Sequence, residues 1–275
     1  MMSDTPCKNA VRHWGRGRLA RDKTIPVSRA RRPRPQSLSA LSAGFTLWEL
    51  LIVLVIALLF MTVFMPAYRH TREMAWKLYC MNNIREMVYA AHQYAYDHNN
   101  EFPPAYQRDY VTRQTVTWES FLWGTNEHQK LVQQCPTFKG SAMWKGDDFT
   151  GYNYNSSYIG GTLYVRDGML LDGSMRSAKL FDIKAPSECA IFGDGEYGGG
   201  ANKFMRSPFP GTLDMDASLA LGGTQGFRHL GYTNVGFVDG HVESLKKRFT
   251  TTAARGTPAE RCGFLSEDNS LYDLE

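Results

Sequence analysis

Residues 44–69, GFTLWELLIVLVIALLFMTVFMPAYR, form the most apolar segment of the chain and decide where the rest of it lies. Residues 50–68 are 19 consecutive positions without a formal charge. As a helix they would extend roughly 28 Å, close to the hydrocarbon thickness of a bilayer. A secretory signal has a shorter apolar core that ends in a small-x-small cleavage site, and no such site follows Met61. The segment is therefore predicted to be a membrane anchor.

The charges are distributed unequally on the two sides of this segment. Residues 1–44 contain ten Lys and Arg against Asp4 and Asp22, a net charge of +8, whereas the remainder has 21 bases and 25 acids, a net charge of −4. A basic, Pro-containing arm is also typical of nucleic-acid-binding tails. Because this arm leads directly into an apolar run, a membrane orientation with a cytoplasmic N-terminus explains it better, and no nucleic-acid partner is expected.

The single acid at the front of the segment, Glu49, is expensive in lipid unless it is paired. With Gly44, Phe45 and Thr46 before it, the segment resembles the type III signal of type IV pilins and of the pseudopilins of type II secretion. That resemblance implies cleavage by a prepilin peptidase between Gly44 and Phe45, N-methylation of Phe45, and a helix bend at Pro66. It also implies that Glu49 pairs with the methylated N-terminus of a neighbouring subunit. A local alternative is that Glu49 only stabilises the first helical turn.

Helical periodicity continues beyond Pro66 and predicts a helix that ends near residues 99–100, before Pro103 and Pro104. Its apolar stripe consists of Cys80, Ile84, Met87, Val88, Ala91 and Ala95. Short strands follow, with hairpins predicted at Asp167-Gly168 and Asp239-Gly240, a strand in 188–197 and a flexible loop at 198–200. The predicted fold is α+β and pilin-like: a long N-terminal helix, transmembrane in its first half, packed on an antiparallel β-sheet head.

This fold divides the chain into five parts. They are a cleaved basic leader (1–44), a transmembrane helix half (45–68), an amphipathic helix half (69–100), an extracytoplasmic β-rich head (101–250) and a weakly structured tail (251–275).

The head carries a second motif, FRHLGYTNVGFVDGH, in which nine residues separate His229 from Asp239-Gly240. It resembles the H-x9-DG signature of prepilin-type processing-associated proteins abundant in Planctomycetes and Lentisphaerae. CMNNIREM, EFPP, CP and APSE, which begin at residues 80, 101, 135 and 185, occur in the order usual for that family. The resemblance covers most of residues 44–243.

Four cysteines follow the predicted cleavage site: Cys80, Cys135, Cys189 and Cys262. Disulfides are allowed in an extracytoplasmic head. The favoured pair is Cys80–Cys135, which would tie the helix to the loop region, although spacing alone does not choose among the three full pairings. The chain has no CxxC, so a structural zinc site is not expected.

Two further groups of residues are candidate metal sites. His229, Asp239 and His241 are candidate metal ligands, but a hairpin turn at Asp239-Gly240 explains the motif without a metal. Asp194 and Glu196 are candidate Ca²⁺ ligands, but five oxygen ligands are not visible and a solvated loop is favoured. No cofactor is therefore expected.

The aromatic segment GYNYNSSY (151–158) suits either glycan binding through Tyr152 and Tyr154 or an ordinary secreted domain. No GxSxG, HExxH or P-loop motif is present, so no enzyme activity is expected.

The function implied by the resemblance is that of a structural subunit, a pseudopilin or pilin-like protein, in a type II secretion or type IV pilus-like fibre. Its expected partners are the prepilin peptidase, other pseudopilins or further copies of the chain, an inner-membrane assembly platform, and the membrane itself. It would be a single-pass inner-membrane protein with its head in the periplasm or outside the cell. The alternatives are a membrane-anchored binding domain that does not polymerise, and a metal-dependent hydrolase that uses His229, Asp239 and His241.

Overall fold

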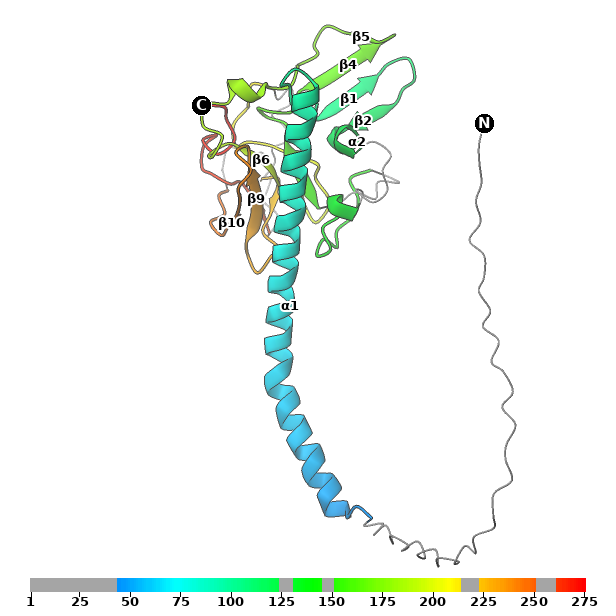
Figure 1. Ribbon diagram of the computed structural model, residues 1–275, viewed down its shortest axis with the longest axis vertical. Helices are drawn as coiled ribbons and strands as arrows, with labels where there is room; N and C mark the ends of the chain where they lie inside the picture. Colours follow the sequence, from blue (N-terminus) through cyan, green and yellow to red (C-terminus); the bar gives the residue numbers. More distant parts are fainter. Residues whose placement is uncertain (1–43, 124–130, 145–150, 214–222, 251–260) are drawn as a thin grey trace, which may run out of the picture. The chain divides into compact units, whose positions relative to one another are not determined.

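The computed structural model describes residues 44–123, 131–144, 151–213, 223–250 and 261–275 (Figure 1). Apart from Gly44, the predicted leader lies outside the described residues. Contacts divide the chain into two compact units, residues 1–53 and 54–275. The fold is α+β, with one long N-terminal helix and three β-sheets.

The long helix α1, Leu47–Asp97, begins and ends where its flanking residues satisfy the free backbone groups. At its start, Thr46 and Glu49 form a capping box, in which each side chain bonds the backbone N–H of the other residue. At its end, Asn99 and Asn100 adopt left-handed φ angles of 55° and 62°, and the Asn100 N–H donates to the carbonyl of Ala95 at 2.8 Å. The predicted end of the helix is confirmed.

The C-terminal half of α1 packs on the head through the predicted apolar stripe. All six stripe residues are fully buried, and Asn83 is buried among them. The helix and the sheet lie close together because the sheet residue that faces the helix is Gly236, which has no side chain. A Cβ atom at that position would lie 2.6 Å from Ile84 Cγ2 and 2.8 Å from Val88 Cγ2. The stripe therefore forms one wall of the main hydrophobic core.

The central sheet has the order β10-β9-β6-β3-β7. Its strands are β3 (Tyr152–Asn155), β6 (Ala190–Asp194), β7 (Phe204–Met205), β9 (Thr233–Phe237) and β10 (Val242–Leu245). A second sheet has the order β2-β1-β4-β5, from β1 (Tyr106–Asp109), β2 (Thr115–Thr117), β4 (Thr162–Arg166) and β5 (Met169–Leu170). The third pairs β8 (Gln225–Gly226) with β11 (Cys262–Gly263). Short helices complete the described elements: α2 (Trp118–Trp123), η1 (Leu131–Gln133) and η2 (Leu180–Asp182).

The prediction of one antiparallel sheet was wrong in two respects. The described strands form three sheets, and the pairs β1–β4 and β3–β7 are parallel. Parallel strands are joined by long crossover connections. The alternation of apolar and polar residues within one strand therefore does not reveal which strand it pairs with.

Both predicted Asp-Gly hairpins are confirmed. Between β4 and β5, Asp167 and Gly168 have φ angles of 51° and 76°, as a two-residue type I′ turn requires. Between β9 and β10, Gly240 has φ 96° and closes a three-residue loop. The loop predicted to be flexible at 198–200 is instead a tight turn, in which Tyr197 and Gly200 exchange two backbone hydrogen bonds.

The tail was predicted to be weakly structured, which is wrong for residues 261–275; residues 251–260 lie outside the described part. Phe264, Leu265 and Tyr272 are buried. The Tyr272 hydroxyl accepts a hydrogen bond from the Leu265 N–H at 2.7 Å, and the Tyr272 carbonyl accepts one from Asn155 at 2.8 Å. This segment consists of a two-residue strand followed by turns, which is too short to show a periodic pattern of apolar residues. Its apolar side chains are nevertheless buried.

Replacing Tyr272 with Phe removes the acceptor of the buried Leu265 N–H. Leaving a buried donor unsatisfied costs about 1–3 kcal/mol, so the free energy of unfolding should fall by that amount. Urea unfolding of the full-length chain in detergent measures it. Tyr96→Phe is the matched control, because Tyr96 is 81% exposed and its change should leave stability within about 0.5 kcal/mol. Equal stability of the two variants would show that the hydrogen bond from Leu265 to Tyr272 does not stabilise the fold.

Candidate functional site

The helix and the head meet at a buried polar cluster, which we call the His229 cluster and define as Cys80, Cys135, Asp194, Arg228 and His229. Cys80 lies on α1, Cys135 follows η1, and Asp194 ends β6. Arg228 and His229 lie between β8 and β9. All five side chains are buried or nearly so. Residues distant in the sequence thus share one small interior volume.

The two thiols of the cluster lie against each other. The sulfur atoms of Cys80 and Cys135 are 3.2 Å apart, and both residues are free cysteines. Cys189 lies elsewhere, with its sulfur 3.5 Å from the carbonyl of Tyr272, and Cys262 lies on β11. Among the described residues only the favoured pair has its sulfurs in contact. The disulfide itself stays a prediction.

An ionic group adjoins the thiols. Arg228 donates to Asp194 Oδ1 at 3.1 Å, to the carbonyl of Gly151, and through Nε to Cys135 Sγ at 3.4 Å. His229 Nε2 lies 3.3 Å from Asp194 Oδ2 and 3.9 Å from Cys135 Sγ. Asp194 Oδ2 also accepts the backbone N–H of Asn234 at 2.7 Å. The fully buried carboxylate is thereby stabilised by two side chains and one backbone donor.

The ionic group shifts the pKa values of its neighbours. Burial lowers the pKa of His229, but the charge and hydrogen bond of Asp194, together with those of Cys135, outweigh burial and raise this pKa to about 9. Burial raises the pKa of Cys135, but the hydrogen bond with Cys80 and the charges of Arg228 and His229 outweigh it and leave this pKa well below its ordinary value. The hydrogen bond with Cys135, together with burial, raises the pKa of Cys80. Cys135 is therefore the thiol that ionises first, beside a thiol that stays protonated.

Local backbone geometry sets the position of His229. His229 and Tyr232 exchange two backbone hydrogen bonds across a turn whose central residues, Leu230 and Gly231, have φ angles of 56° and 82°. This is a type I′ turn, which leads directly into β9. Because Asn234 on β9 bonds Asp194 on β6, the pairing of these two strands brings the carboxylate to the histidine.

The H-x9-DG residues do not meet, so the candidate metal ligands His229, Asp239 and His241 do not form one site. β9 separates them, and five extended residues span roughly 17 Å. Asp239 and His241 lie at the partly exposed hairpin loop, where His241 Nδ1 is 2.5 Å from Asp239 Oδ1. At that end the N–H groups of Val238 and Asp239 donate to the carbonyls of Cys189 and Pro186. The motif therefore holds the two ends of one central strand.

The candidate Ca²⁺ ligands Asp194 and Glu196 have other partners. Asp194 is fully buried in the cluster, and Glu196 lies 3.6 Å from Arg228 Nη1. Each of the two carboxylates is thus paired with a cation. The prediction of a solvated loop did not include this pairing. The group with metal-binding atom types is instead Cys80, Cys135 and His229, whose ligand atoms all lie within 4.8 Å of one another. Thiolate and imidazole are ligands that Zn²⁺ accepts, but the Arg228 guanidinium already donates to one of these sulfurs.

Tyr152 and Tyr154 are also buried, which contradicts their suggested role in glycan binding. The Tyr152 hydroxyl accepts a hydrogen bond from Asn83 at 3.0 Å, and the Tyr154 hydroxyl donates to the carbonyl of Pro103 at 2.9 Å. Both lie on β3, whose four residues are all buried. These tyrosines belong to the core.

Comparisons of the chain with protein-family models, with curated proteins and with solved structures found no match.

We expect Cys80 and Cys135 to be joined in the protein isolated from an oxidising compartment. Denaturing mass spectrometry without reductant should give a mass lower by two hydrogen atoms, and peptide mapping should place the crosslink at these residues. Reduction should lower the free energy of unfolding by about 2–4 kcal/mol. Cys189→Ala is the control and should keep the crosslink. Free thiols together with stoichiometric zinc in the native protein would contradict the disulfide and assign the site to a metal.

The raised pKa of His229 predicts a pH dependence of stability. A histidine with a pKa of about 9 in the folded chain and 6.5 in the unfolded chain stabilises the fold fully below pH 6.5. This contribution disappears as pH rises through about 9. The urea midpoint of the wild type should therefore fall between pH 6.5 and 9.5 by more than that of His229→Asn. Parallel pH profiles of the two proteins would show that His229 does not carry a bound proton.

Proposed function

We propose that the chain is a prepilin-type structural subunit, anchored by one transmembrane helix and assembled into a pseudopilin or pilin-like fibre. The observation that carries the proposal is the apolar N-terminal part of α1, which bears the lone acid Glu49. This part is a candidate membrane span by its length and its mean hydropathy of 2.8, and none of that window is buried by the rest of the protein.

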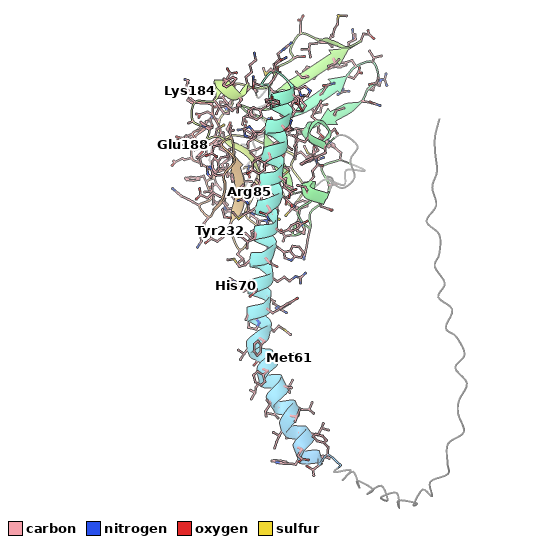
Figure 2. All side chains as sticks on the ribbon, in the orientation of Figure 1. Met61, His70, Arg85, Lys184, Glu188 and Tyr232 are labelled. Atoms are coloured by element: carbon pink, nitrogen blue, oxygen red, sulfur yellow. The ribbon has the colours of Figure 1, made fainter. Side chains whose placement is uncertain are left out.

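The exposed apolar surface is continuous. Phe45, Leu47 and Trp48 are exposed, and so are all the large apolar side chains in residues 50–65. Figure 2 shows Met61 projecting from the helix with no other segment against it. An apolar surface of this extent is far larger than a soluble monomer exposes. Lipid or neighbouring helices must therefore cover it.

The predicted cleavage site is accessible. Gly44 and Phe45 are both exposed, and a Cβ atom at Gly44 would have no neighbour within 4 Å. A peptidase can therefore reach the Gly44–Phe45 bond from several sides. Cleavage there would leave Glu49 as the fifth residue of the mature chain.

Glu49 has two roles to distinguish. In the single chain its Oε2 accepts hydrogen bonds from the N–H and the hydroxyl of Thr46, at 2.9 and 2.8 Å. This capping box stabilises the helix start without any partner chain. In a fibre the same carboxylate could instead pair with the amine of a neighbouring Phe45, which would set the stagger between subunits. The first role needs a hydrogen-bond acceptor, whereas the second needs a negative charge.

The head leaves the apolar part of α1 free to associate. Its stripe contacts begin at Cys80, after the predicted span. Packing of this helix against those of other copies therefore does not require the head to unfold. The proposed partners follow: a prepilin peptidase, further copies or other pseudopilins, and an assembly platform in the inner membrane.

Two substitutions at Glu49 separate the roles. Glu49→Gln keeps an acceptor for the capping box and removes the charge, whereas Glu49→Ala removes both and should destabilise the helix start by about 1 kcal/mol. We expect both variants to be cleaved to an N-methylated Phe45, as read by N-terminal peptide mass spectrometry. We also expect both to be lost from fibres sheared from the native cell.

The outcomes of this experiment are distinct. Assembly of Glu49→Gln but not of Glu49→Ala would assign Glu49 to capping and contradict charge pairing. Normal function of both variants, with no fibre in the wild type, would favour a membrane-anchored binding domain. A native chain that keeps its basic arm would contradict prepilin processing altogether.

A further inference from the structure

The head has a cationic pocket at the end where α1 emerges from it. The pocket has a volume of about 520 Å³, and the residues on which its chemistry depends are Glu73, Arg228, Leu230, Lys246, Arg248 and Arg261. They come from α1, from the turn before β9, from the segment after β10 and from the residue before β11. Four cations and one carboxylate thus surround one open volume.

Two of the four cations have no ion pair within the described residues. Arg228 is committed to Asp194 and Glu196. Lys246 and Arg261 have no carboxylate at ion-pair distance in the part of the chain that the structure describes, and Arg248 donates to the carbonyl of Cys262 at 3.5 Å. Glu73 offsets one charge. Lys246 and Arg261 together exceed Glu73 by one positive charge, which favours an anionic ligand.

Neighbouring side chains hold this face together. The ammonium groups of Lys77 and Lys246 lie 3.9 and 5.7 Å from the centre of the Tyr232 ring. Figure 2 shows Tyr232 at the end of the head nearest His70, whereas Lys184 and Glu188 lie toward the other end. Lys77 and Lys246 therefore lie, with Tyr232, at the end of the head nearest the apolar part of the helix.

The edge of the pocket at Glu73 lies close to the outer boundary of the lipid headgroups. Tyr68 is the last residue of the uncharged run, and Glu73 follows it by five residues, or roughly 7.5 Å of helix. The headgroup layer of a bilayer occupies about the first 5–7 Å outside the hydrocarbon core. Leu230, at the tip of its turn, is 39% exposed beside the cations. An exposed apolar side chain among cations suits the boundary between headgroups and acyl chains.

We propose that this pocket binds the phosphate of an anionic phospholipid headgroup in the leaflet that the head faces. The inference rests on the membrane anchor of the proposed function, since only an inserted helix places the pocket at that depth. Lys246 and Arg261 contact the phosphate, and Leu230 contacts the upper acyl region.

The test compares two double variants of the full-length chain in a neutral detergent. Lys246→Gln with Arg261→Gln removes two pocket cations. Lys179→Gln with Lys184→Gln removes two exposed cations that flank η2, which makes it the matched control. Native mass spectrometry with added dioleoylphosphatidylglycerol or dioleoylphosphatidylcholine gives the apparent affinities. The same titration with excess inorganic phosphate tests whether free phosphate takes the site.

We expect the wild type and the control to prefer phosphatidylglycerol over phosphatidylcholine by roughly 10- to 30-fold, and the pocket variant to lose this preference. Equal preference in the pocket variant would overturn the proposal. Complete displacement of the lipid by inorganic phosphate would overturn the lipid assignment and leave a site for free phosphate.

A flotation assay with liposomes separates this inference from the proposed function. Both double variants should float with membranes as the wild type does, because the apolar helix inserts without the pocket. Insertion without any lipid preference overturns the pocket alone. Failure of the wild type to insert overturns the membrane anchor and the pocket with it.

Discussion

The carboxylate of Asp194, which has no contact with solvent, imposes a constraint that the arrangement of the head satisfies from several directions. A buried charge of this kind is tolerated only when cations and hydrogen-bond donors surround it. The donors come from the side chains of Arg228 and His229 and from the backbone of Asn234. The same two side chains then face Cys135, whose sulfur contacts Cys80 on the long helix. The contact between helix and head at this point therefore depends on how β6 pairs with β9.

The long helix has two parts with opposite physical requirements. The C-terminal part buries one stripe against a sheet that approaches closely at Gly236, and it is stabilised by the head. The N-terminal part exposes apolar side chains on every side, which in water would promote aggregation. No change in the head could bury those side chains, because the stripe begins beyond them. A lipid environment or an assembly of like helices satisfies this requirement, and the proposed function provides both in turn.

The sequence was informative where one local rule decides the structure. The stripe followed from helical periodicity, and two hairpins followed from Asp-Gly pairs that accept positive φ angles. It was uninformative about sheet order, because β7, β8 and β11 have two residues each and parallel pairs depend on long crossovers. The alternation of Tyr and Asn in β3 left a surface role open for Tyr152 and Tyr154, but all four residues of this strand are buried. His229 was singled out by its motif, but its partner Asp194 was read as part of a loop, since only the pairing of β6 with β9 brings the two together.

The spacing within H-x9-DG has a structural explanation. The nine intervening residues comprise the turn through Leu230 and Gly231, the entry to β9, the strand itself and the start of the hairpin loop. One end is fixed by the His229 ion pair, and the other by backbone hydrogen bonds from Val238 and Asp239 to residues 186–189. Between them, Gly236 lies against Ile84 and Val88 of the helix. A strand held at both ends keeps this glycine in place, so a shorter or longer spacing would misplace the surface on which the helix packs. The motif thus acts as a scaffold for the joint between helix and head, which leaves the exposed apolar helix and the cationic pocket as the surfaces available to partners.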